Sequence, residues 1–164
     1  MIREHHGVIT PRARIGLALV VAAGALSFGV GIFVAPTRAW GGYLMALAFF
    51  TSLALAGPVF LALLALSGAR WSVALQRIPE AMSAALPAAA VLGLGLLLGT
   101  HSLYEWSHAG AVRLDPLLQH KSAWLDPTGF AVRLVVAFVT WIVCARRLVT
   151  LGRRVEAGEP GAIE

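Results

Sequence analysis

The chain has 164 residues, of which 59% are hydrophobic and 13% charged, whereas soluble domains average about 45–50% apolar and about 25% charged residues. A soluble fold of this length needs more charge to cover its surface, so the composition predicts an integral membrane protein. The net charge is +5. The basic residues flank apolar runs and do not gather on one face, which argues against a nucleic-acid partner.

Four apolar runs are long enough to cross a membrane as helices, because about 20 residues span a hydrocarbon core of about 30 Å. We therefore expect an all-α, polytopic membrane protein with a four-transmembrane-helix bundle in residues 15–147, between an N-terminal tail, 1–14, and a polar tail, 148–164. The expected spans are about 15–34, 41–67, 81–100 and 127–145. Gly93, Gly95 and Gly99 in the third run predict close helix packing in lipid.

The Lys and Arg residues are divided unevenly between the two sides of the expected bundle. Nine lie in the terminal tails and the second loop, and three lie in the loops on the opposite side. Since basic residues concentrate on the cytoplasmic side, both termini are predicted to be cytoplasmic. Residues 101–126 then lie outside; we call them the polar segment.

The polar segment holds the candidate functional residues. Histidine as a residue type titrates near physiological pH and carboxylates can be tuned toward it, so a segment that holds both could relay protons. The competing interpretation is a solvated loop without chemistry. The candidates for proton transfer or for facing a quinone are His101, Tyr104, Glu105, His108, Asp115, His120, Lys121 and, in the fourth span, Arg133.

Arg133 is the only charged residue inside an expected span, six residues after Pro127. An arginine in lipid is costly and usually faces a bundle interior or a polar cavity. One hypothesis pairs Arg133 with a carboxylate of the polar segment or with a ligand oxygen. The other has the side chain reach the membrane surface.

The cysteine and histidine content limits the cofactors. The single cysteine, Cys144, excludes a disulfide within the chain, a CxxCH haem attachment and cysteine-held metal sites. The first, second and fourth spans have no histidine, so facing haem ligands are not expected. The sequence predicts no metal site and no catalytic residue.

The second loop, residues 68–80, is amphipathic, with Trp71, Leu75 and Ile78 at helical spacing on one face. Such a segment is expected to lie in the membrane interface. This loop also begins a series of residues that fall in a distinctive order. They are Gly68-Ala69-Arg70-Trp71-Ser72, Arg77, Pro79, Glu80, Met82, His101, Leu103-Tyr104, Trp106, His108, Asp115-Pro116-Leu117-Leu118, His120-Lys121, Phe130 and Arg133.

This series resembles the ActF-type, NrfD/PsrC-like membrane subunit of alternative complex III, the bacterial quinol:cytochrome c oxidoreductase. The resemblance runs from about residue 40 to residue 147 and corresponds to the N-terminal four-helix part of longer family members. It implies a structural loop motif of Arg70, Trp71, Arg77 and Glu80. It also implies a multi-pass subunit of the bacterial inner (plasma) membrane that supports quinol oxidation, with proton passage as a further role.

The resemblance implies no redox cofactor in this chain, with quinone as a ligand and with haem and iron–sulfur clusters in partner subunits. The expected partners are an ActC-like membrane subunit, iron–sulfur and cytochrome c subunits, and lipid. Two other functions stay open. One is a membrane anchor or assembly protein without electron or proton transfer. The other is a small transporter, a function that polar residues or broken helices at the membrane midplane would indicate.

Overall fold

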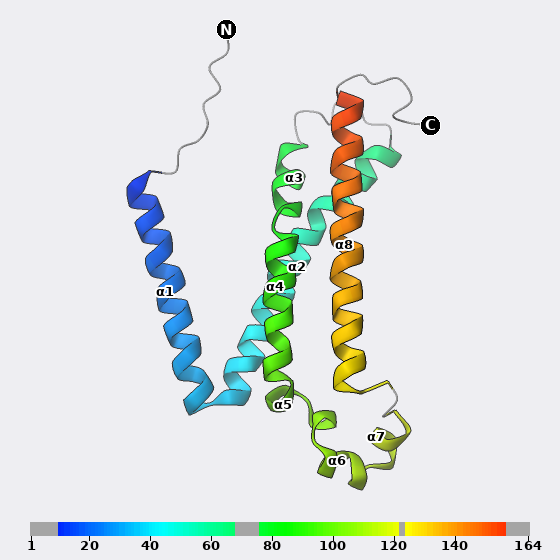
Figure 1. Cartoon of the computed structure of the whole chain (residues 1–164). Helices are drawn as coiled ribbons and strands as arrows, with labels where there is room; N and C mark the ends of the chain where they lie inside the picture. The colour runs from blue at the N-terminus through cyan, green and yellow to red at the C-terminus, as the bar shows by residue number, and fades with distance from the viewer. Residues whose placement is uncertain (1–9, 68–75, 122–123, 157–164) are drawn as a thin grey trace.

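The computed structural model describes residues 10–67, 76–121 and 124–156. The described residues form helices and no strand. Figure 1 shows their order along the chain. The elements are α1 (Pro11–Val34), α2 (Pro36–Leu66), α3 (Arg77–Ser83), α4 (Leu86–Gly95), the 3-10 turn η2 (Leu96–Gly99), α5 (Thr100–Leu103), the 3-10 turn η3 (Glu105–Ser107), α6 (Ala109–Leu114), α7 (Pro116–His120) and α8 (Pro127–Glu156).

Four stretches of helix are long and apolar enough to cross a membrane: Pro11–Val34, Pro36–Leu66, Arg77–Leu103 and Pro127–Arg154. This confirms the prediction of an all-α membrane protein with four spans. The helices extend beyond several of the expected span limits, because hydropathy marks only the part of a helix that suits hydrocarbon. The helix itself continues into its polar ends.

The third span changes conformation twice, which hydropathy alone does not predict. α3 ends at Ser83 and α4 begins at Leu86, because Pro87 has no N–H to donate to the carbonyl of Ser83. The Ser83 hydroxyl donates a hydrogen bond to the Pro79 carbonyl over 2.7 Å. The second change is the 3-10 turn η2.

The core lies where α2, the third span and α8 meet. Leu86 of α4 is fully buried, and it packs with Ala54 of α2 and Ala145 of α8. Small residues at these positions let the helix backbones come close together, as is typical of packing in lipid. In Figure 1, α4 and α8 run side by side and α2 crosses behind them, and each of the three helices contacts the other two.

Glycines of the third span each receive an aromatic ring from a neighbouring helix. A Cβ atom on Gly99 would collide with the indole of Trp40, and one on Gly93 would lie 2.5 Å from the ring of Phe138. The predicted close packing at these glycines is therefore confirmed. Trp40 comes from α2 and Phe138 from α8, so these contacts join the third span to both neighbours.

α1 stands apart from the other spans, and none of its residues is buried. Ala35 alone connects α1 to α2, so the two helices form a tight hairpin. Near this turn, the ring of Phe28 lies 5.3 Å from that of Trp40 and 5.2 Å from that of Tyr43. Figure 1 shows α1 diverging from α2 and α4 toward the N-terminus.

Candidate functional site

The polar segment forms one end of the molecule, between the third span and α8. α5, η3, α6 and α7 follow one another there as short turns of helix, as Figure 1 shows. All the candidate residues except Arg133 belong to this region. Arg133 lies in the second turn of α8, which begins at the same end.

Two of the three predicted histidines meet. His101 lies in α5 and His108 follows η3, and their ring centroids are 3.9 Å apart with planes inclined by 47°. Both side chains are exposed. In the described part of the chain, no side-chain hydrogen bond or ion pair connects this histidine pair to Glu105, Asp115 or His120.

Tyr104 belongs to an aromatic cluster that joins the polar segment to α8. Its ring stacks on Trp106 with centroids 5.1 Å apart and planes inclined by 20°. Phe130 of α8 lies 5.8 Å from Tyr104 and 5.9 Å from Trp106. The cluster holds the turn after α5 against the first turn of α8, so Tyr104 has a packing role.

The remaining candidates of the polar segment do not converge on one point. The carboxylate of Asp115 accepts a hydrogen bond from the backbone N–H of Leu117 over 2.8 Å and caps α7. Glu105 begins η3, while His120 and Lys121 lie at the C-terminal end of α7, and all three are exposed. These positions fit the solvated-loop interpretation as well as a surface that exchanges protons with water.

Arg133 has a different partner from the expected carboxylate. Its guanidinium donates a hydrogen bond to the backbone carbonyl of Trp124 over 2.6 Å, and it lies 4.5 Å from the centroid of the Trp124 ring. Helical side chains lean toward the N-terminus of their helix, which directs Arg133 toward the end where α8 begins. The nearby carboxylate of Asp126 instead accepts a hydrogen bond from the N–H of Gly129 over 3.1 Å.

At the opposite end of the molecule, part of the predicted loop motif is helical. Arg77 and Glu80 lie in α3 and belong to the third span, because the helix begins before the apolar run. The Glu80 carboxylate accepts a hydrogen bond from the guanidinium of Arg153 in α8 over 3.0 Å. Arg70 and Trp71 lie outside the described residues.

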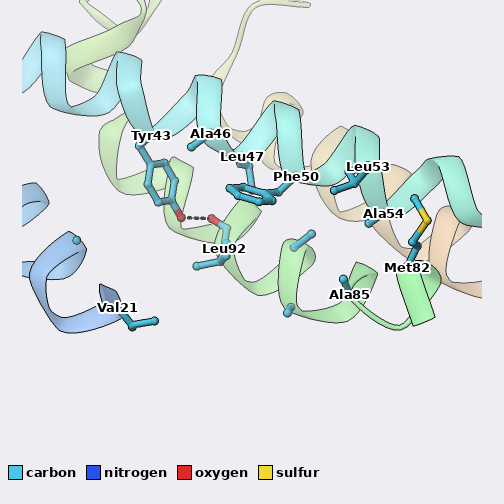
Figure 2. Close-up of a pocket in the computed structure, with 13 residues that line it drawn as sticks. Val21, Tyr43, Ala46, Leu47, Phe50, Leu53, Ala54, Met82, Ala85 and Leu92 are labelled. Carbon is cyan, nitrogen blue, oxygen red and sulfur yellow. Dashed lines mark hydrogen bonds between the residues drawn. The ribbon is translucent and has the colours of Figure 1, made fainter. Parts of the chain in front are cut away.

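An apolar groove of about 630 Å³ lies between α1 and the pair α2 and α4. Figure 2 shows Val21 on the α1 side and Phe50 and Leu92 on the other. The lining is almost wholly hydrocarbon, so the groove suits an acyl chain or an apolar side chain and not an ion. The sequence does not predict this groove, since hydropathy does not report how far one span leans from the next.

The polar group in this groove is the Tyr43 hydroxyl, which donates a hydrogen bond to the Leu92 carbonyl over 2.5 Å (Figure 2). Where η2 begins, the N–H of Leu96 donates its hydrogen bond to the Gly93 carbonyl. This leaves the Leu92 carbonyl without its usual helical donor, and a backbone group in lipid needs a partner. Tyr43 supplies one.

Among the described residues, no group of three or more His, Cys, Asp and Glu side chains could hold a metal ion. Cys144 is a free, exposed thiol in α8. A search of known protein families and of curated proteins finds no match to the sequence of this chain. The polar segment and the start of α8 thus offer an imidazole pair, an aromatic cluster and an arginine that donates to the Trp124 carbonyl.

Proposed function

We propose that the chain is an integral membrane subunit of a quinol:cytochrome c oxidoreductase of the alternative complex III type. It supports quinol oxidation in the complex, while haem and iron–sulfur clusters belong to the partner subunits. The complex lies in the bacterial inner membrane, and both termini of this chain are cytoplasmic. The observation that carries the proposal is the ordered series from Gly68 to Arg133 that resembles the ActF-type subunit.

Contacts among members of that series support the proposal. Tyr104, Trp106 and Phe130 form one aromatic cluster, although Phe130 is distant in sequence from the other two. His101 and His108, also members, touch each other. A series whose residues pack together is what a shared local structure requires, whereas chance matches along the sequence would carry no such relation.

The exposed histidine pair is suited to proton passage. Quinol oxidation releases protons, and imidazoles accept and return protons near neutral pH. In the proposal, His101 and His108 receive protons at the surface of the complex and, since both side chains are exposed, return them directly to water. Arg133 and Tyr104 fix the shape of this end of the chain through Trp124 and Phe130.

The apolar surface of the spans is compatible with a subunit role. No residue of α1 is buried within the chain, and large side chains such as Leu26 and Phe33 are exposed. In a membrane, such faces pack against lipid or against helices of other subunits. A larger assembly would give α1 neighbours over most of its length.

The test is purification from native membranes. The full chain with a C-terminal affinity tag is extracted in a mild detergent, co-purifying proteins are identified by mass spectrometry, and haem is measured by absorbance. We expect iron–sulfur and cytochrome c subunits to co-purify, with quinol:cytochrome c activity in the eluate. Recovery of the chain without haem-bearing partners, from membranes that contain this activity, would contradict the proposal.

A pair of variants links the result to the resemblance. Tyr104→Ala removes a ring from the aromatic cluster, and we expect it to reduce the yield of co-purifying partners. Phe49→Ala removes an exposed ring of α2 that lies outside the resembling series, and this control is expected to retain them. Equal yields in the two variants would show that the resembling series has no part in assembly.

A further inference from the structure

The C-terminal end of α8 carries an unusual concentration of positive charge: Arg146, Arg147, Arg153 and Arg154. Arg153 is held by Glu80. The side chains of Arg146 and Arg147 are exposed, and in the described part of the chain no hydrogen bond or ion pair engages either guanidinium. The Thr150 hydroxyl bonds only the backbone carbonyls of these two residues.

The length of α8 places these two guanidinium groups at a membrane surface. α8 begins at Pro127, and a rise of about 1.5 Å per residue puts Arg146 about 28 Å farther along the axis. That distance is close to the hydrocarbon thickness of about 30 Å. Arg146 and Arg147 therefore stand at the level of the lipid phosphates when the start of α8 lies at the other surface.

The helical face of Arg147 is continuous with an apolar face that points away from the bundle. Val143 and Val136 precede Arg147 at the spacing that keeps residues on one side of a helix. They are 50% and 58% exposed. Ala145, on the opposite side of α8, is only 3% exposed and belongs to the core. The outward face thus changes from hydrocarbon-compatible to cationic where the lipid itself changes from acyl chain to phosphate.

We propose that this face binds an anionic phospholipid. The phosphate lies at Arg146 and Arg147, and the acyl chains lie along Val143 and Val136. A guanidinium group can donate two parallel hydrogen bonds to phosphate oxygens, and a headgroup with net negative charge complements the two unpaired cations. Each basic residue at a membrane surface contributes about 1 kcal/mol toward anionic lipid, or about a fivefold preference. The inference requires only that the chain lies in a membrane, so it stands independently of the proposed function.

The experiment titrates lipid onto the detergent-solubilised full chain and counts bound lipids by native mass spectrometry. Phosphatidylglycerol is compared with phosphatidylcholine of the same acyl chains. We expect tighter binding of phosphatidylglycerol. The double variant Arg146→Gln/Arg147→Gln should weaken that binding roughly 10- to 30-fold and leave phosphatidylcholine binding unchanged.

The matched control is Arg12→Gln/Arg14→Gln, which removes the same charge at the start of α1, at the same end of the molecule (Figure 1). It should weaken phosphatidylglycerol binding less than the α8 pair does, because α1 stands apart from α8 and does not carry the face of Val143 and Val136. Arg146→Lys/Arg147→Lys keeps the charge and should lose less affinity than the glutamine pair. Circular dichroism checks that each variant is helical. If the glutamine pair does not fold, the affinity of the lysine pair for phosphatidylglycerol is compared with that of the unaltered chain.

Equal binding of the two lipids by the unaltered chain overturns the proposal, because the chain then has no preference for an anionic headgroup. Equal weakening in the α1 control also overturns it, because the basic residues then act by their charge alone and not as a site on α8. A partner protein that co-purifies with the chain and blocks phosphatidylglycerol binding at this face would also overturn it. A partial loss of affinity in the lysine pair and a larger loss in the glutamine pair support it.

Discussion

The guanidinium of Arg153 donates a hydrogen bond to the carboxylate of Glu80 over 3.0 Å, although the two residues are 73 positions apart in the chain. The contact ties the last turns of α8 to the first turn of α3, at the end of the molecule opposite the polar segment. The Glu80 side chain is 12% exposed and that of Arg153 is 65% exposed, so water screens one side of the pair.

The first prediction concerns this ion pair. In a double-mutant cycle of Glu80→Gln and Arg153→Gln, we expect a coupling energy of about 0.2–1 kcal/mol, because exposed ion pairs contribute little. The coupling should shrink as salt is raised. Unfolding in mixed micelles, followed by circular dichroism, gives the free energies. The control is a second cycle that pairs Glu80→Gln with Arg146→Gln. An equal coupling energy in this control cycle would show a general charge effect and not a specific ion pair.

The second prediction concerns Gly99. Gly99→Ala places a Cβ atom against the indole of Trp40, so the ring must shift in a packed interface. We expect a loss of about 1–3 kcal/mol in the free energy of unfolding. Gly42→Ala in α2 is the control, since a Cβ there meets nothing within 4 Å; alanine favours helix at such a position. If both variants unfold at the same denaturant concentration, the Trp40 contact does not constrain the fold.

The third prediction concerns the Tyr43 hydroxyl. Tyr43→Phe leaves the Leu92 carbonyl without the hydrogen bond seen in Figure 2. We expect destabilisation of about 0.5–1.5 kcal/mol, toward the lower value if the unfolded chain in the micelle finds other donors. Tyr104→Phe is the matched control, because that tyrosine contributes its ring to the aromatic cluster. A larger effect at Tyr104 than at Tyr43 would contradict this assignment.

Composition and hydropathy were sufficient for the number and type of the spans, because lipid imposes length and apolarity on every helix that crosses it. The same applies to the glycines of the third span, whose lack of a side chain has one evident use in helix packing. Trp40 and Phe138 were not predicted as their partners, since any aromatic residue on a neighbouring helix could have filled the space.

Local interruptions and side-chain partners were harder to predict. The structure gives Arg133 the backbone carbonyl of Trp124 as its hydrogen-bond acceptor, and charge complementarity, on which the carboxylate hypothesis relied, does not suggest a backbone partner. The histidine pair depends on the turns of α5 and η3, which hydropathy does not specify. The lean of α1, and with it the groove in Figure 2, depends on a single-residue turn at Ala35.

The fourth prediction concerns topology. Single cysteines at Leu117, exposed in α7, and at Ser67, at the end of α2, are introduced with Cys144→Ser. In intact cells an impermeant thiol reagent should label the Leu117→Cys protein and spare the Ser67→Cys protein, as the unequal division of basic residues predicts. Permeabilised cells, in which both sites react, provide the control. The reverse labelling pattern would place both termini outside.

The last prediction concerns Arg133. The loss of stability on replacing it should differ between a guanidinium at the membrane surface and one in a buried ion pair. If the guanidinium reaches the membrane surface, Arg133→Leu loses one hydrogen bond and one cation–π contact at a wet site. The expected cost is about 1–2 kcal/mol. Arg133→Lys should recover only part of this loss, because an ammonium group lacks the planar set of donors.

Trp124→Leu keeps the backbone carbonyl and removes only the cation–π contact, so it should destabilise the protein less than Arg133→Leu does. When Trp124→Leu is added to the Arg133→Leu protein, it should cause no further loss of stability. Unfolding in mixed micelles gives the free energy of unfolding for the unaltered chain and the four variants. A loss of about 3–5 kcal/mol in Arg133→Leu is the size that breaking a buried ion pair produces, and it would return Arg133 to the interior of the bundle.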